Sequence, residues 1–194
     1  MEYKLDSPAV IIDGRFLVPV RIISESFGAK VDWVDATQTV IIEYTSMAFT
    51  GEFKADNDIE GALPFYALVQ RGDDGGSNIK HIVDGSVGTK WAFKADGENN
   101  SGYGIFDLGS VKTLDKLHIA FLKSETRIYK FSVLVSEDGV NYKAVIENKE
   151  NANKDGSFEV YDLSGASARY VKFVGYGNNE NTWNNLTEFV VTGK

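Results

Sequence analysis

The sequence predicts a mainly β protein, an antiparallel sandwich or barrel preceded by a small ββαββ unit, and three observations support this expectation. Aromatic residues are plentiful, with 12 Phe, 9 Tyr and 3 Trp among 194 residues. The chain holds 19 Gly but only 3 Pro, and short extended runs alternate with Asn, Asp and Gly, as in strands joined by tight turns. The 43% apolar content is enough for one standard domain plus a small one.

The first 45 residues carry the signals of the ββαββ unit. Hairpin turn chemistry, helical spacing of apolar residues and period-two alternation follow one another along this stretch. In order, we expect a strand at 9–12, a turn at Asp13-Gly14, an extended run at 16–20, a helix over 20–27 capped by Gly28, and a hairpin with strands at 30–33 and 39–42. The predicted organisation is a unit at 1–45, a linker at 46–50 and a sandwich at 51–194.

From residue 51 onward, short strands recur without a strong helix signal. Phe131, Val133 and Val135 alternate with more polar neighbours, the period of a half-buried strand. Evenly spaced strands of this kind favour an antiparallel sandwich or barrel. The strand candidates are 103–108, 116–122, 129–135, 158–163, 169–175 and 187–191, separated by turn signals at Asp107-Leu108-Gly109, Asp138-Gly139, Asp155-Gly156 and Gly177-Asn178-Asn179.

Charge and composition exclude several functions. A net charge of −8 and the lack of a basic stripe argue against a nucleic-acid partner. The chain has no Cys, which excludes a disulfide framework, a thiol nucleophile and a Cys-based zinc site. No apolar run reaches transmembrane length, so we expect no membrane insertion. Residues 1–4 do not open a signal peptide, so a secreted protein with this sequence would be a fragment of a longer chain.

The N-terminal segments "VIIDGRFLVPVRIISESFGAKVDW" and "TQTVII" resemble the copper amine oxidase N-terminal-like repeat. The resemblance covers nearly all of residues 8–43 and implies no copper chemistry. It implies a secreted or cell-surface protein of a Gram-positive bacterium, in which the repeat stands beside other domains of a longer parent chain. The family unit often includes an extra upstream hairpin, so the resemblance implies a truncated copy here. Asp13 and Arg15 are interpreted as charges of a hairpin turn, not as catalytic groups.

Four phrases in the C-terminal part resemble the discoidin-like, coagulation-factor (F5/8) type C family, in particular the carbohydrate-binding modules of family 32. They are "HIVDGSVGTKWAF", "YGIFDLGSVKTLDKLHIAF", "YKFSVLVSEDGVNYKAV" and "ARYVKFVGYGNNENTWNNLTEFVV", in family order. The resemblance implies a jelly-roll β-sandwich that binds polysaccharide or oligosaccharide. An Arg before the Tyr-x-Phe strand and an Asn-rich loop ending in Trp-Asn-x-Leu-Thr-Glu are similar to modules attached to alginate lyases.

The same resemblance implies a structural calcium ion between the Asp84 turn and the last strand. Oxygen donors of this kind suit a hard cation. The implied ligands are the side chains of Asp84, Thr89 and Glu188 with the backbone carbonyls of His81 and Ser86. The alternative interpretation is a plain Asp84-Gly85 turn and a surface acid at Glu188. We expect the ion to tie a loop to the closing strand and to take no part in chemistry.

The candidate ligand-binding residues lie in two loops. Arg127 presents a planar fork that matches the carboxylate of a uronic acid. The Asn-rich loop offers amides for sugar hydroxyls and rings for sugar C–H groups. Its alternative role is purely structural, with Asn and Gly forming turns and Trp183 filling the base of the sandwich. The predicted ligand-binding set is Arg127, Tyr176, Asn178, Asn181, Trp183 and Asn184; Trp91 is expected in the core.

The predicted function is therefore non-catalytic binding of an acidic, uronate-type polysaccharide, and it has two alternatives, an enzyme and an adhesion module. Glycoside hydrolysis requires two placed carboxylates, and neither His81 nor His118 has an obvious acid, base or nucleophile partner in the sequence. An adhesion module that binds a protein or another surface partner is the remaining alternative. A lipid-binding role is disfavoured because the expected loop tips, 124–126 and 178–181, are polar.

Overall fold

The chain divides into two compact units, Met1–Thr50 and Gly51–Lys194, and each is described by itself. The computed structural model describes residues 10–13, 15–17, 19, 29–35, 37–44, 54–55, 58–69, 78–96 and 100–194. The predicted helix over 20–27 and the predicted linker at 46–50 lie outside these residues. The exact domain limits stay a prediction.

Two hairpins make up the described part of the N-terminal unit. Strands β1 (Val10–Ile12) and β2 (Arg15–Leu17) pair with Ile12 opposite Arg15, so a two-residue turn joins them. Asp13 in that turn has a φ of 50°, the left-handed conformation expected of a tight hairpin. Strands β3 (Ala29–Val34) and β4 (Thr39–Tyr44) form the second hairpin. Both hairpins fall where the sequence predicts them.

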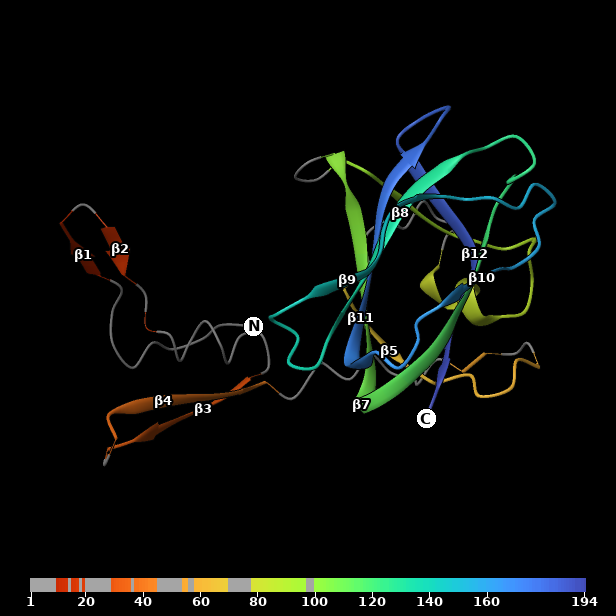
Figure 1. The fold of residues 1–194 in the computed structure, drawn as a ribbon. Helices are drawn as coiled ribbons and strands as arrows, with labels where there is room; N and C mark the ends of the chain where they lie inside the picture. Colours follow the sequence, from red (N-terminus) through yellow and green to blue (C-terminus); the bar gives the residue numbers. More distant parts are fainter. Residues whose placement is uncertain are drawn as a thin grey trace. The chain divides into compact units, whose positions relative to one another are not determined.

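The C-terminal unit is an antiparallel β-sandwich, as predicted (Figure 1). One layer has the order β5-β7-β11-β8-β9, and the other has the order β6-β12-β7-β10. A short 3-10 helix, η1, packs against β12 and β6. The elements are β5 (Tyr66–Val69), η1 (Ile79–Val83), β6 (Trp91–Lys94), β7 (Gly102–Phe121), β8 (Tyr129–Ser136), β9 (Lys143–Glu150), β10 (Glu159–Asp162), β11 (Ser167–Asn178) and β12 (Trp183–Gly193).

Strand β7 belongs to both layers. Its first part pairs with β5 and β11, and its second part pairs with β10 and β12. Figure 1 shows it running down one layer, bending at the lower end and rising beside β10. The sequence predicts two strands with a turn at Asp107-Leu108-Gly109, and this prediction is wrong. Gly109 has a φ of 78°, which glycine adopts without steric cost, and it lies at a register shift in the β7–β11 pairing inside one continuous strand.

The core between the layers is built from aromatic rings. Trp91, Phe93, Phe131, Phe173 and Phe189 are each 0% exposed. The rings of Trp91 and Phe93 lie 4.3 Å apart between centroids, and those of Phe131 and Phe173 lie 5.6 Å apart. Residues from β6, β8, β11 and β12 therefore meet in one cluster. Trp91 is in the core, as predicted.

Two glycines on β7 make room for these rings. A Cβ at Gly104 would lie 2.5 Å from the Trp91 ring, and a Cβ at Gly102 would lie 2.4 Å from the carbonyl oxygen of Lys94. Real Cβ atoms do not approach other atoms so closely, so larger residues here would push β6 away from β7. Both positions face the core because Phe106, two residues beyond Gly104, is also buried.

A partly buried ion pair joins β7 to β11 on the other face of the five-stranded layer. Arg169 donates two hydrogen bonds to the Asp107 carboxylate, from Nε at 2.8 Å and from Nη2 at 2.9 Å. The backbone N–H of Gly109 donates a third, at 2.8 Å. Burial of Asp107 raises its pKa, but the hydrogen bonds and the charge of Arg169 outweigh burial and hold the pKa below its ordinary value of 3.8.

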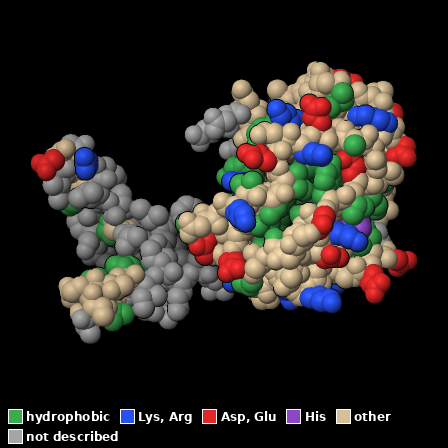
Figure 2. Space-filling view, in the orientation of Figure 1, with side chains coloured by type: hydrophobic (Ala, Val, Ile, Leu, Met, Phe, Trp, Pro, Cys, Tyr) green, Lys and Arg blue, Asp and Glu red, His purple; other side chains and the backbone are tan. Residues whose placement is uncertain are grey.

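The surface of the sandwich carries charges of both signs. Figure 2 shows Lys and Arg side chains interspersed with Asp and Glu around a central group of hydrophobic side chains. A net charge of −8 is therefore spread out and does not form one acidic face in this view. Within the part of the chain that the structure describes, no helix is long and apolar enough to cross a bilayer.

The close approach of Gly104 to Trp91 gives the first prediction. Gly104→Ala should lower the free energy of unfolding by about 1–3 kcal/mol, because the new methyl group overpacks the core. Gly88→Ala is the matched control: its Cβ would meet only the Ser86 hydroxyl at 3.5 Å, an ordinary contact. Urea unfolding of both variants measures the difference. Equal midpoints would contradict the packing argument.

The pKa of Asp107 gives the second prediction. A carboxyl whose pKa is lowered on folding stabilises the fold above its unfolded pKa, and this contribution disappears as pH falls through the folded value. Asp107→Asn should therefore cost about 1–3 kcal/mol at neutral pH, and the difference from the unmodified protein should shrink below about pH 4. Urea unfolding at about pH 7 and about pH 2.5 tests this pH dependence. If the difference in unfolding free energy is the same at both pH values, the substitution destabilises the fold through its shape and not through the lost charge.

Candidate functional site

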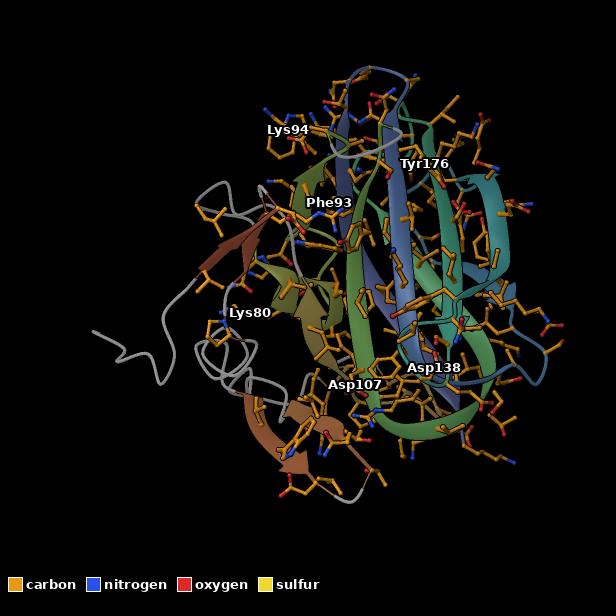
Figure 3. The ribbon with its side chains drawn as sticks, turned by 90° about the vertical axis from the view of Figure 1, so that its left-hand side faces the viewer. Lys80, Phe93, Lys94, Asp107, Asp138 and Tyr176 are labelled. Carbon is orange, nitrogen blue, oxygen red and sulfur yellow. The ribbon has the colours of Figure 1, made fainter. Side chains whose placement is uncertain are left out.

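The Asn-rich loop joins the two layers of the sandwich at one end. It leaves the five-stranded layer at Asn178, the last residue of β11, and enters the other layer at Trp183, the first residue of β12. Figure 3 shows Lys94 and Tyr176 toward this end, and Asp107 and Asp138 toward the opposite end. The loop before β8, which carries Arg127, contacts it: the N–H of Ile128 donates to the Asn179 side chain at 2.8 Å.

Asn178 holds the loop in shape. Its side-chain oxygen accepts hydrogen bonds from the N–H groups of Glu180 (2.9 Å) and Asn181 (3.2 Å). Its amino group donates to the Asn181 side-chain oxygen at 3.0 Å and to the Trp183 carbonyl at 2.6 Å. An Asn side chain can accept two and donate two hydrogen bonds, so Asn178 is fully used inside the loop. It positions the other residues.

Asn184 is also structural. It is 1% exposed, and its side-chain oxygen accepts a hydrogen bond from the N–H of Gly177 at 2.9 Å. A Cβ at Gly175 would lie 2.3 Å from that oxygen, so this glycine is needed for the close approach. Asn181 differs because it lies on the surface. Its oxygen accepts from the N–H of Trp183 at 3.0 Å, while its amino group makes no hydrogen bond to the described residues.

Arg127 is engaged with the same loop. Its Nε donates to Glu180 at 2.9 Å, and its side chain is 18% exposed. The hydroxyl of Tyr129 and the Glu180 carboxylate both raise the pKa of Arg127 above its ordinary value. The guanidinium group is therefore charged and fixed in place. The sequence did not predict the partner Glu180, which cancels part of this positive charge.

The two predicted aromatic residues face different surroundings. The Tyr176 hydroxyl lies 3.2 Å from the Ser132 hydroxyl across the β11–β8 pair. Trp183 is half-buried, and the ammonium group of Lys94 lies over its ring, 5.1 Å from the centroid. Trp183 therefore stands at the loop with a cation beside it. Lys94 is absent from the residues that the sequence singles out.

The Asp84 turn brings oxygen atoms together as a hard cation requires. The Thr89 hydroxyl lies 3.0 and 2.8 Å from the two Asp84 carboxylate oxygens and 3.0 Å from the Ser86 carbonyl. One hydroxyl proton cannot satisfy three acceptors, whereas a cation of Ca²⁺ type is bound by oxygens in this way. The side chains of Asp84 and Thr89 and the carbonyl of Ser86 therefore fit the implied ion.

The remaining implied ligands come from the helix and strand beside that turn. Glu188 is fully buried on β12, against which η1 packs, and His81 lies in η1. The His81 ring nitrogen Nδ1 lies 3.0 Å from the Lys90 carbonyl, so the ring is used within the turn. Among the described residues, no group of three or more His, Asp and Glu side chains is placed for a metal. An ion here would depend on hydroxyl and carbonyl oxygens as well as carboxylates.

Comparison with protein families agrees with this architecture. A model of the F5/8 type C domain matches residues 68–189. The chain belongs to the F5/8 type C domain family. Residues 1–49 match the copper amine oxidase N-terminal domain. Both resemblances proposed from the sequence are thus confirmed. No curated protein sequence matches the chain at a significant level.

Several solved structures that resemble this chain are carbohydrate-binding modules. The module of AlyQ in complex with 4,5-unsaturated mannuronic acid is 25% identical, with a TM-score of 0.56, and the match covers 73% of this chain and 97% of that one. A pectin-binding module is 24% identical, with a TM-score of 0.58 and coverage of 67% and 89%. A module from Clostridium perfringens in complex with GalNAc-β-1,3-galactose is 24% identical, with a TM-score of 0.53 and coverage of 68% and 99%. The last two similarities concern the fold alone.

Proposed function

We propose that this F5/8 type C domain is a non-catalytic module that binds acidic, uronate-type polysaccharide through the end of the sandwich that carries the Asn178–Trp183 loop. The observation that carries the proposal is the contact between the segment 126–128 and this loop: Arg127 pairs with Glu180, and Asn179 bonds the backbone on either side of Arg127. This contact holds a charged guanidinium group against the loop that also carries the exposed Asn181 amide and the half-buried Trp183 ring. The likeness to a module that holds an unsaturated mannuronic acid supports the choice of a uronate.

Each part of this site matches one part of a uronic acid. The amino group of Asn181 can donate to a sugar hydroxyl or ring oxygen. The Trp183 ring offers an apolar face for C–H groups. Arg127 carries four N–H donors besides Nε, and a guanidinium group pairs with a carboxylate in the same plane. Neutral sugars would use the first two contacts and lack the third.

The proposal places the protein outside the cell, where such polysaccharides occur, as part of a longer chain with other domains. One shallow site of this kind binds weakly. Several modules on one parent chain would raise the overall affinity by multivalency. Adhesion to a protein surface is the alternative function, and it predicts no preference among sugars.

The ion pair between Arg127 and Glu180 provides the test. Arg127→Ala should weaken binding to oligouronates about tenfold, or ~1.4 kcal/mol, because the charged donor is lost. Glu180→Gln should strengthen binding by about two- to fivefold, because it frees Arg127 from an exposed ion pair. Isothermal titration with oligomers of mannuronate or galacturonate measures both effects.

The same titrations with carboxyl-reduced, neutral oligomers are the control. Their affinity should be the same in all three proteins. If Glu180→Gln weakens uronate binding as much as Arg127→Ala does, the pair serves to hold the loop and Arg127 does not read the carboxylate. If the unmodified protein binds no oligosaccharide but is retained on a protein surface, the adhesion alternative is correct.

We also propose that the Asp84 turn holds a structural calcium ion with Thr89, Glu188 and the carbonyls of His81 and Ser86. The ion would supply positive charge between η1 and β12 and take no part in ligand chemistry. The support for this proposal is the convergence of oxygens on the Thr89 hydroxyl. The other carbonyl and Glu188 would complete the shell.

Calcium should therefore raise thermal stability. At a hundredfold excess over Kd, Ca²⁺ should increase Tm by roughly 5–10 °C relative to chelator-treated protein. Asp84→Asn should abolish this increase. Asp138→Asn, which removes a turn carboxylate bound by Val140 and Asn141, should keep it. Differential scanning calorimetry with Ca²⁺, Mg²⁺ and chelator measures the shift. The same Tm with Ca²⁺ and with chelator would contradict the calcium site.

A further inference from the structure

Lys94 stands at the same loop as Arg127 but comes from the other layer of the sandwich. It is the last residue of β6, directly opposite Trp183 in the β6–β12 pair. The next residue, Ala95, donates its N–H to the Thr182 carbonyl at 2.8 Å. These backbone contacts fix the base of the Lys94 side chain beside the loop. Figure 3 shows the residue at this end of the sandwich.

The charge of Lys94 is available in a way that the charge of Arg127 is not. The side chain is exposed, and its ammonium group lies 5.1 Å from the centroid of the Trp183 ring. It has no carboxylate partner among the described residues, whereas Arg127 is paired with Glu180 at 2.9 Å. An anion that approaches Lys94 therefore need not displace an acidic side chain of the residues that the structure describes. Contact with a half-buried ring at the surface is a weak restraint that a carboxylate can replace.

We propose that Lys94 and Trp183 form a carboxylate-reading subsite for one uronic acid of the bound polysaccharide. The ammonium group would pair with the carboxylate, and the indole would contact the C–H groups of the same sugar ring. This inference rests on the proposed carbohydrate-binding function and names the residues that select acidic sugars. Arg127, on the other side of the loop, would meet a second uronate of the chain.

The two cations fit a chain ligand better than a single sugar. Every residue of a polyuronate carries a carboxylate, so a bound chain presents negative charges at regular intervals. Lys94 is attached to the four-stranded layer, and Arg127 lies just before β8 of the five-stranded layer. The loop between them offers the polar Asn181 side chain. A monosaccharide would use one cation, and a longer oligomer would use both.

Substitution of Lys94 tests the subsite. Lys94→Met keeps the length and apolar stem of the side chain but removes the charge. It should weaken binding to oligouronates about five- to tenfold, or ~1.0–1.4 kcal/mol, and should leave binding to carboxyl-reduced oligomers unchanged. Lys94→Arg should retain most of the uronate affinity. Titration calorimetry at low and high salt should also show a weaker salt dependence for Lys94→Met.

Lys143→Met is the matched control, because it removes the same charge from the β9 end that pairs with Val135, near the Asp138 turn. It should bind oligouronates within about twofold of the unmodified protein, since a cation beyond the Debye length contributes little. If Lys94→Met keeps the full preference for uronates over neutral oligomers, the subsite is refuted while the proposed function stands. If the unmodified protein binds neither kind of oligomer, the proposed function itself has failed.

Tryptophan fluorescence gives an independent measurement. In a Trp33→Phe background only Trp91 and Trp183 remain, and Trp91 is fully buried in the core. Binding of an oligouronate should change the emission of Trp183, because it draws the Lys94 ammonium group from the ring. The change should be absent in Trp183→Phe and strongly reduced in Lys94→Met. A full spectral change in Lys94→Met would show that the ligand contacts the indole without the help of Lys94.

Discussion

The sharing of one strand by both layers is the constraint on which the rest of the sandwich depends. Strand β7 pairs with β11 in one layer and with β12 in the other. The connection between β11 and β12 must therefore cross from layer to layer, and the Asn178–Trp183 loop is that crossing. Gly104 lets β7 pass close to Trp91, and Gly109 lies at a register shift within the same strand. The position of the candidate site follows from the crossing between the layers.

This crossing loop is held in one shape because its Asn side chains form hydrogen bonds within the loop. Asn178 saturates its hydrogen bonds within the loop, and buried Asn184 holds the turn at Gly177. A loop already held in one shape loses little conformational entropy when a ligand binds. The polar side chains of Asn178 and Asn184 thus stabilise the loop itself. In the proposed site, the groups available for recognition are the amino group of Asn181, the Trp183 ring and the cations Lys94 and Arg127.

The sequence predicts the strands well where local signals suffice, as at Phe131–Val135 and the Asp138-Gly139 turn, because period-two alternation and turn chemistry act over a few residues. The prediction of a turn between two strands at Asp107-Leu108-Gly109 is wrong, because an irregularity inside one strand and a turn between two strands use the same residue types. The sequence assigns one ligand-binding role to Asn178, Asn181 and Asn184 because they are the same residue type in one loop. Their roles differ by burial and hydrogen bonding, which the sequence does not show. Lys94 carries no local signal, because its significance comes from Trp183, a strand partner far along the chain.

A protein with a net charge of −8 must overcome general repulsion to hold a polyanion. At physiological ionic strength the Debye length is about 8 Å, so most of the acidic side chains on the sandwich are screened from a ligand at the loop end. In the proposed site, Lys94 and Arg127 would act at contact distance, where screening is weak. Salt would then reduce the distant repulsion and the local attraction together, and the net dependence on ionic strength would be smaller than two cations alone would cause. Selection of acidic sugars can therefore reside in a few local charges even on an acidic protein.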